Sequence, residues 1–197
     1  MSAIASRPAA TLARAAAAFA LSLGFWVAFA RPYENLLALA AERVLRATES
    51  PSVTRLEARE GEILVDRADF PPAAPRPGLP AADLHFNFVL LVALFALDRH
   101  PLRPQRVAAL LAAAVLLFLV HVAALVVQVR SVYAASLGEW SSARYGSFWR
   151  QLWTGAFHFY QIAGRFAAPF AIWWPFRTAR DEDGSPVRAR TRRRAAG

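Results

Sequence analysis

The sequence contains no cysteine and no lysine. Without cysteine, disulfides, thiol nucleophiles and cysteine-based metal sites are excluded, whatever the compartment in which the protein works. All 23 basic side chains are arginines, and alanine is abundant. We interpret this bias as the mark of a GC-rich genome rather than as selection for guanidinium chemistry.

Common catalytic and metal-binding spacings are also missing. The four histidines form no H-x-x-H or H-E-x-x-H pattern, and there is no G-x-S-x-G nucleophile motif. No long apolar run combines an acidic residue with a histidine. The sequence therefore predicts a protein that is not an enzyme, with no catalytic residue, no metal site and no cofactor.

Hydrophobic residues make up 56% of the chain, whereas about 45–50% is typical of a soluble domain. They are concentrated in long runs separated by charged stretches, which is the pattern of a membrane protein. Because a spanning helix needs about 20 residues, we predict an all-α membrane protein with about four transmembrane helices. The predicted spans are residues 9–30, 84–97, 107–129 and 149–176.

The first apolar run, residues 15–30, reaches spanning length only if it extends back past Arg14 to residue 9. Its basic start and its Ala28-Phe29-Ala30 ending also resemble a signal peptide. The bulky Phe29, followed at once by arginine and proline, favours a retained anchor over a cleaved signal. Both alternatives place the next segment outside the cytoplasm.

The segment 31–83 is the longest polar stretch, and its first part predicts an amphipathic helix over residues 33–48. This helix either continues the first span or lies on the membrane surface. Its apolar residues at helical spacing are Leu36, Leu37, Ala40, Val44 and Ala47.

Residues 53–58 and 63–67 predict two short strands, and Glu60-Gly61 supplies the turn of a β-hairpin between them. The proline-rich run 70–80 cannot form a regular helix or a central strand, so we predict a linker there. The predicted membrane protein thus carries one small extracytoplasmic β-hairpin between spans 1 and 2.

Arginine placement predicts the orientation. The N-terminus, the turn 99–106 and the C-terminal tail are rich in arginine, whereas 31–83 has seven arginines against nine acidic residues. The positive-inside bias therefore places both termini in the cytoplasm, although the polar loop 130–150, with three arginines, would lie outside against this bias. The predicted parts are 1–30 (cytoplasmic N-terminus and first span), 31–83 (extracytoplasmic segment), 84–176 (three-span bundle) and 177–197 (disordered, arginine-rich cytoplasmic tail).

Polar side chains within the apolar runs are the candidate functional residues, because each is costly in hydrocarbon. His158, Gln161 and Arg165 share one face of the predicted fourth span, and His121 lies at a similar depth on the third. We expect His121 and His158 to face each other within a polar cluster. Additional candidates are Asn87 and Gln128. The alternative is that these side chains only hold helices together through interhelical hydrogen bonds.

Two charged features need separate interpretation. Arg165 has no acidic partner within any predicted span, so a carbonyl, His158, a lipid headgroup or another protein must satisfy it. The basic cluster 192–194 is compatible with nucleic acid, but on a tail that follows a membrane helix it favours anionic lipid headgroups. We therefore predict membrane lipids as partners and no nucleic acid.

The layout resembles the small exosortase-associated membrane proteins, in particular those associated with exosortase H. The similar pieces are 53–57 (VTRLE) with 61–65 (GEILV), then 85–97 (HFNFVLLVALFAL) and the charged turn 98–106. The resemblance covers residues 15–176, and its motifs are short and hydrophobic.

This resemblance implies an accessory role. Exosortases are multi-span transpeptidase-like enzymes that use a cysteine, an arginine and a histidine, and this chain has no cysteine. The resemblance therefore implies a non-catalytic accessory protein of the cytoplasmic (inner) membrane, and an exosortase-like membrane protein of a protein-sorting system as its partner. The alternative is a small transporter or lipid-binding membrane protein that uses the His121, His158, Gln161 and Arg165 cluster.

Overall fold

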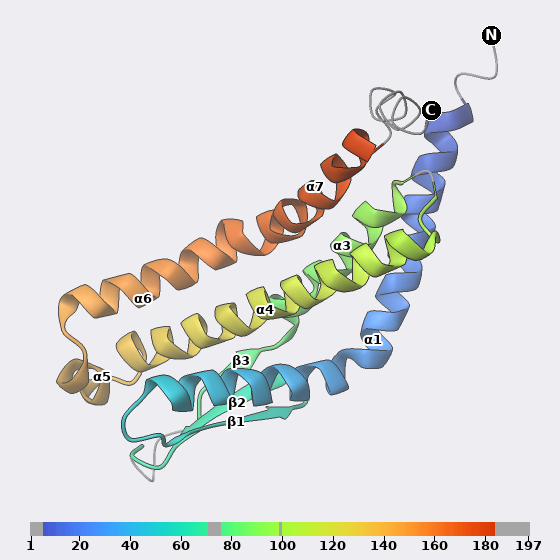
Figure 1. Ribbon diagram of the computed structural model, residues 1–197. Coiled ribbons are helices and arrows are strands. Elements are labelled where there is room, and N and C mark those ends of the chain that lie inside the picture. The colour runs from blue at the N-terminus through green and yellow to red at the C-terminus, as the bar shows by residue number, and fades with distance from the viewer. Residues whose placement is uncertain (1–5, 71–75, 99, 184–197) are drawn as a thin grey trace, which may run out of the picture.

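The computed structural model describes residues 6–70, 76–98 and 100–183. The structure is mostly helical, with one small sheet (Figure 1). The elements are α1 Ser6–Thr48, β1 Thr54–Arg59, β2 Glu62–Arg67, β3 Gly78–Pro80, α2 Ala82–His85, α3 Asn87–Ala96, α4 Pro104–Ala135, α5 Glu139–Arg144, α6 Ser147–Phe159, the π-helical η1 Tyr160–Gly164, and α7 Arg165–Asp183.

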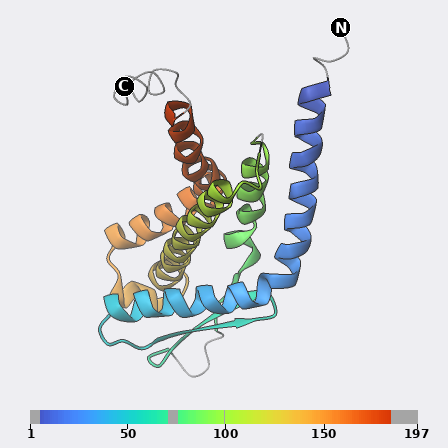
Figure 2. The same ribbon diagram turned by 45° about the vertical axis from the view of Figure 1, so that its right-hand side comes forward.

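Helix α1 is continuous but sharply bent. Its first half runs along α3, and its second half turns and crosses the sheet, as both views show (Figures 1 and 2). Pro32 lies inside this helix. A proline in a helix removes one backbone hydrogen bond and clashes with the carbonyl four residues earlier, which accounts for the bend.

The second half of α1 is the helix predicted over residues 33–48, but its buried face differs from the expected one. Leu37 and Leu45 are fully buried. Leu36 is 53% exposed and Val44 is 42% exposed. Sequence spacing alone cannot show which apolar side of a helix packs against the rest of the protein. The predicted apolar face therefore combined residues that are buried with residues that are exposed.

The predicted hairpin is confirmed. Strands β1 and β2 pair antiparallel, with Thr54 opposite Arg67 and Arg59 opposite Glu62. The two turn residues, Glu60 and Gly61, have φ angles of 53° and 83°, as a two-residue type I′ turn requires.

A third strand, β3, was not predicted. It adds to β2 and gives the order β1-β2-β3. Its last residue, Pro80, stands on the sheet edge, where a proline removes no ladder hydrogen bond. The remainder of the expected linker includes 71–75, which lie outside the described residues.

Two backbone N–H groups on the free edge of β1 are bonded by carboxylates, one from α1 and one from the residue directly after it. Thr54 N–H donates to Glu49 Oε1 at 2.7 Å, and Leu56 N–H donates to Glu42 Oε2 at 2.9 Å. An open edge strand exposes unpaired backbone groups that invite pairing with other chains. Here the two carboxylates occupy those groups and attach the hairpin to α1.

A buried ion cluster connects the sheet to the end of the helical bundle. The Arg67 Nη1 atom lies 2.7 Å from Glu49 Oε2, and these two side chains are 8% and 4% exposed. The Arg67 guanidinium also stacks over the rings of Tyr133 and Trp140, at 5.0 and 5.5 Å from their centroids. Its hydrogen bond to Asp69 holds the pKa of that carboxyl below its usual value.

Helix α4 is the central helix and contacts α1, α3, α5, α6 and α7. At its first turn, the buried Arg106 donates to the carbonyl of Phe176 at 2.9 Å and pairs with Asp98 at 3.1 Å. The start of α1 and the end of α7 lie at the same end of the molecule, and the sheet lies at the opposite end (Figures 1 and 2).

Among the described residues, two helices are long and apolar enough to cross a membrane, namely the part of α1 from Leu12 and the whole of α4. The predicted third span is therefore a helix of the expected kind. The predicted second span forms only the short helices α2 and α3, and the predicted fourth is divided among α6, η1 and α7.

Two predicted irregular segments are helical instead. The loop expected over 130–150 contains the end of α4, all of α5 and the start of α6. The tail expected to be disordered from residue 177 continues as α7 to Asp183, and residues 184–197 lie outside the described residues. The prediction from charge was wrong here, because charged residues such as arginine and glutamate also have high helix propensity.

Replacement of Glu49 tests whether the buried ion cluster anchors the sheet. We expect Glu49→Ala to lower the free energy of unfolding by about 3 kcal/mol, because it leaves a buried guanidinium with one partner fewer. Denaturant titration of the full chain in detergent measures the loss. Arg59→Ala is the matched control, since the Arg59–Glu60 pair is 66% and 77% exposed and should contribute less than about 1 kcal/mol. Equal losses in both variants would contradict the anchoring role.

Candidate functional site

A chain of hydrogen bonds crosses the middle of the bundle and joins four helices. The Tyr33 hydroxyl of α1 lies 2.5 Å from His121 Nδ1 on α4, and His121 Nε2 lies 2.7 Å from Asn87 Oδ1 on α3. The Asn87 amide donates to the carbonyl of Arg165 at the start of α7, at 2.7 Å. His121 is fully buried and Asn87 is 7% exposed, so the chain is closed to its surroundings.

The direction of these hydrogen bonds fixes the tautomer of neutral His121. Because Asn87 donates its NH₂ group to a carbonyl, its Oδ1 atom faces His121 and can only accept. The proton of the neutral imidazole therefore lies on Nε2, and Nδ1 accepts from the Tyr33 hydroxyl. Both ring nitrogens of His121 are thus used in helix-to-helix contacts.

A second buried histidine, His85 of α2, lies on the other side of Tyr33, with 5.2 Å between the ring centroids. Its Nδ1 atom accepts a hydrogen bond of 2.7 Å from the indole of Trp26. Its Nε2 atom lies 3.5 Å from Glu34 Oε1 and makes no hydrogen bond within the part of the chain that the structure describes.

Glu34 and His85 form the ionisable pair of the site. Glu34 is 5% exposed and His85 is 1% exposed. A buried carboxylate is costly unless a partner compensates its charge, and the nearest described partner is the imidazole. Because the Trp26 indole can only donate, the proton of neutral His85 lies on Nε2, towards the carboxylate.

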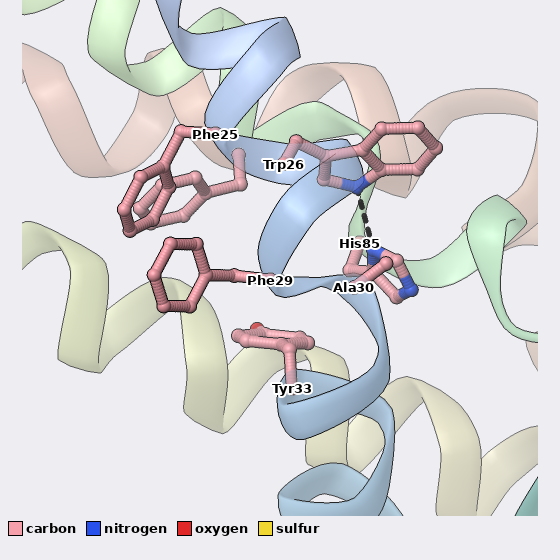
Figure 3. Close-up of a pocket in the computed structure, with 7 residues that line it drawn as sticks. Phe25, Trp26, Phe29, Ala30, Tyr33 and His85 are labelled. Carbon is pink, nitrogen blue, oxygen red and sulfur yellow. Dashed lines mark hydrogen bonds between the residues drawn. The ribbon is translucent and has the colours of Figure 1, made fainter.

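Next to this pair lies an open pocket of about 80 Å³ at the side of α1 (Figure 3). The two stacked rings of Phe25 and Phe29 lie on one side, with Trp26 and His85 on the other and Tyr33 below them. Ala30 and Phe88 complete the lining. The pocket is therefore almost entirely apolar, with the buried polar groups behind its lining.

The expected pairing of His121 with His158 is wrong. His121 is buried, whereas His158 lies on the exposed surface of α6. Equal depth in two predicted spans does not fix the face of either helix, and both ring nitrogens of His121 are occupied by Tyr33 and Asn87. The predicted common face of His158 and Arg165 assumed 3.6 residues per turn. The π-helical turn η1 lies between them and adds about one residue to the turn, which rotates the residues after it by about 100°.

Arg165 and Gln161 do lie together. Arg165 Nη1 is 3.3 Å from Gln161 Oε1 and 3.7 Å from Asp83 Oδ1. The arginine side chain is 33% exposed and Asp83 is 52% exposed. Asp83 precedes the predicted second span by one residue. The prediction considered only acidic residues within the spans, and it therefore missed this partner.

The two additional candidates, Asn87 and Gln128, are both buried. Asn87 connects His121 to Arg165 through its main-chain carbonyl. Gln128 Oε1 makes no hydrogen bond with the described residues. The structure therefore places His121 and Asn87 in one hydrogen-bond chain, brings Gln161 and Arg165 next to it, and leaves His158 apart.

Sequence reasoning missed Tyr33, Glu34, His85 and Trp26. Three of these residues lie close to Pro32 in sequence, and the bend at that proline brings their side chains towards α2 and α4. The sequence did contain a signal for two of these residues. Tyr33 and Glu34 form a polar pair directly after a proline, at the end of an apolar run. The partner His85 could not be identified, because it depends on how α2 packs.

Comparison with known proteins gives no match: no family model, no curated protein and no solved structure corresponds to this chain. Within the described ranges, no group of three or more histidine, aspartate and glutamate side chains is arranged to hold a metal ion. The geometry of the site is therefore the basis for assigning its role.

A double-mutant cycle tests whether the His121 chain acts as one unit. We expect Tyr33→Phe to lower the free energy of unfolding by about 1–3 kcal/mol, because His121 Nδ1 loses its buried partner. In a His121→Phe background, the same change should cost at least about 0.5 kcal/mol less. Denaturant titrations in detergent give the four values. Tyr145→Phe serves as the control, and it should add independently to His121→Phe; additive Tyr33 and His121 effects would contradict the coupling.

Proposed function

We propose that the protein crosses the cytoplasmic membrane with four spans. In this proposal the start of α1 and the end of α7 both lie on the cytoplasmic side. The arrangement of the elements supports this proposal. The arginine-rich turn before α4 lies towards the same end as the start of α1 and the end of α7, and the net acidic segment that contains the sheet lies at the other (Figure 1).

The short α2 and α3 helices and the divided α6–η1–α7 helix are compatible with spans. Residues 82–96 form a nearly continuous apolar helical stretch, and local thinning of the bilayer can accommodate a short one. Pro169 and Pro175 lie inside α7. Neighbouring helices in membrane proteins supply hydrogen bonds to the backbone groups that such prolines release.

We propose further that the protein is a non-catalytic accessory protein. The buried polar groups are largely used in contacts between helices, as in the chain from Tyr33 through His121 and Asn87. This is how polar side chains hold a membrane bundle together. The resemblance to exosortase-associated membrane proteins identifies the partner we propose, an exosortase-like enzyme of a protein-sorting system.

The observation that favours partner binding is the position of His158. It is exposed on α6, and the neighbouring Phe159 and Ile162 are 70% and 76% exposed. Neither α6 nor η1 contains a buried residue. Because an ionisable side chain facing lipid is costly, a partner helix that accepts its hydrogen bond would account for an exposed histidine among apolar residues.

The alternative function, transport or lipid handling through the His121, His158, Gln161 and Arg165 cluster, has less support. It needs all four side chains around one path, and His158 lies on the outer surface of α6. His121 is also closed off by its two hydrogen bonds. We therefore favour the accessory role.

Reporter fusions test the proposed topology. Alkaline phosphatase is active only outside the cytoplasm, so we expect activity for a fusion after Pro80 and none for a fusion after Arg103. Colony activity normalised to the amount of fusion protein is the measurement. Activity in both fusions, or the reversed pattern, would overturn the orientation.

Co-purification tests the partner. We expect the wild-type chain to retain an exosortase-like enzyme from the same cell in mild detergent. His158→Leu should weaken retention about threefold, the effect of one average interhelical hydrogen bond. Ile162→Leu is the matched control on the same exposed surface and should retain the enzyme fully. Wild-type chain that purifies without the enzyme would refute the partnership, and equal retention by the two variants would refute the role of His158.

A further inference from the structure

His85 contacts α1 on both sides of the bend at Pro32. Its Nδ1 atom accepts a hydrogen bond of 2.7 Å from Trp26, which lies before the bend. Its Nε2 atom lies 3.5 Å from the Oε1 atom of Glu34, which lies after the bend. The His85 side chain is buried, with 1% of the residue exposed. One imidazole on α2 therefore connects the two halves of α1.

The hydrogen bond from Trp26 requires a neutral His85. An indole N–H only donates, so it bonds a ring nitrogen that carries a free lone pair. An imidazolium carries a proton on both ring nitrogens and accepts from neither side. Protonation of His85 therefore places two N–H groups against each other and breaks the bond to Trp26.

The other buried histidine of the site does not have this constraint. The Nδ1 atom of His121 faces the hydroxyl of Tyr33, and a hydroxyl both donates and accepts. A protonated Nδ1 keeps this contact when the hydroxyl reverses its role. Of these two imidazoles, His85 is the one whose positive charge is incompatible with its contact to α1.

Glu34 supplies the counter-charge for a protonated His85. The carboxylate side chain is 5% exposed, so water screens its charge little. The Nε2 atom that faces it makes no other hydrogen bond within the described part of the chain. A charged His85 consequently gains a stronger contact with the second half of α1 when it loses its contact with the first half.

The remaining titratable and charged groups around this pair come from several elements. Tyr33 of α1 lies against His85, His121 of α4 follows behind Tyr33, and Tyr160 of η1 lies next to Tyr33. Arg165 of α7 lies near Tyr160 and pairs with Asp83 of α2 at 3.7 Å. Because tyrosines are ordinarily neutral at neutral pH and Asp83 already faces Arg165, Glu34 is the counter-ion for His85 among these groups.

Trp26 can move when its hydrogen bond breaks. The residue is only partly buried and lines the open pocket at the side of α1 (Figure 3). Its other ring contact is an edge contact with Phe86, which is itself 45% exposed. Few residues of α1 before the bend are buried, so the bond to His85 is an important attachment of this half of the helix.

We propose that His85 is a pH-dependent switch at the bend of α1. Neutral His85 holds Trp26 and fixes the first half of α1 against α2. Protonated His85 releases Trp26 and pairs with Glu34, while Tyr33 and Glu42 keep the second half attached to α4 and to the sheet. The angle between the first half of α1 and the sheet therefore depends on pH. The switch depends on neither the exosortase-like partner nor the number of spans.

Fluorine NMR of the full chain in detergent tests the switch. The six tryptophans are replaced by fluorotryptophan, Trp26→Phe identifies the resonance of Trp26, and nitrogen-labelled histidine reports the charge of each imidazole. The titration covers about pH 8 to about pH 5, the range in which histidine serves as a switch. We expect the Trp26 resonance to shift in step with the protonation of His85.

Three variants identify the groups that cause the transition. His85→Asn offers an amide oxygen to Trp26 but cannot be protonated, so the Trp26 resonance should not move. Glu34→Gln removes the counter-charge and should shift the transition to a more acidic pH. His158→Asn is the matched control, because this histidine is exposed on α6, and it should leave the transition unchanged.

Spin labels measure the bend itself. The chain has no cysteine, so Leu21→Cys before the bend and Glu57→Cys on the sheet, both at exposed positions, can be labelled without removing native thiols. We expect acidification to broaden the distribution of distances between the two labels. In the His85→Asn background the distribution should stay the same.

Four results would overturn the switch. Protonation of His85 without a shift of Trp26 would contradict the donor argument, and a Trp26 shift that persists in His85→Asn would assign the transition to another group. The absence of any transition of His85 in this pH range would exclude it as a switch. An unchanged distance distribution would show that Trp26 does not control the bend. All four results leave the proposed partner and topology untouched.

Discussion

The hydrogen-bond chain from Tyr33 through His121 and Asn87 to the Arg165 carbonyl is the contact on which the arrangement of the helices depends. It joins α1, α4, α3 and α7 at one level of the bundle. Between apolar helices, van der Waals packing and interhelical hydrogen bonds of polar side chains together determine how the helices align. Each member of this chain also leaves another buried group unsatisfied if it is removed, which makes the four helices interdependent.

The sheet is attached to two of these helices, α1 and α4, through a different kind of interaction. A small hairpin is marginally stable alone, and here its edge is closed by Glu42 and Glu49 while Arg67 inserts between α1 and the aromatic end of α4. The bend of α1 makes both attachments compatible, because one helix contributes Tyr33 to the bundle and Glu42 to the sheet. The sheet is consequently fixed in orientation relative to the helical bundle.

Local sequence signals predicted the local features. The hairpin with its Glu60-Gly61 turn and the long apolar α4 depend on near neighbours in the sequence, and both are present. The site was predictable only in part. His121 and Asn87 were identified by the cost of polar groups among apolar ones, whereas the partner of His121 was misassigned. Depth along two helices does not show which faces meet. The common face predicted for His158 and Arg165 fails for another reason, because the π-helical turn at 160–164 changes the face of every later residue and has no recognisable sequence signal. Tyr33 and His85 depend on the bend and on α2, which are tertiary features.

The pocket and the hydrogen-bond chain share Tyr33, and this residue connects them physically. Tyr33 and Trp26 present their rings to the pocket and their polar atoms to His121 and His85. The pocket therefore has its shape only while α1 is aligned with α2 and α4.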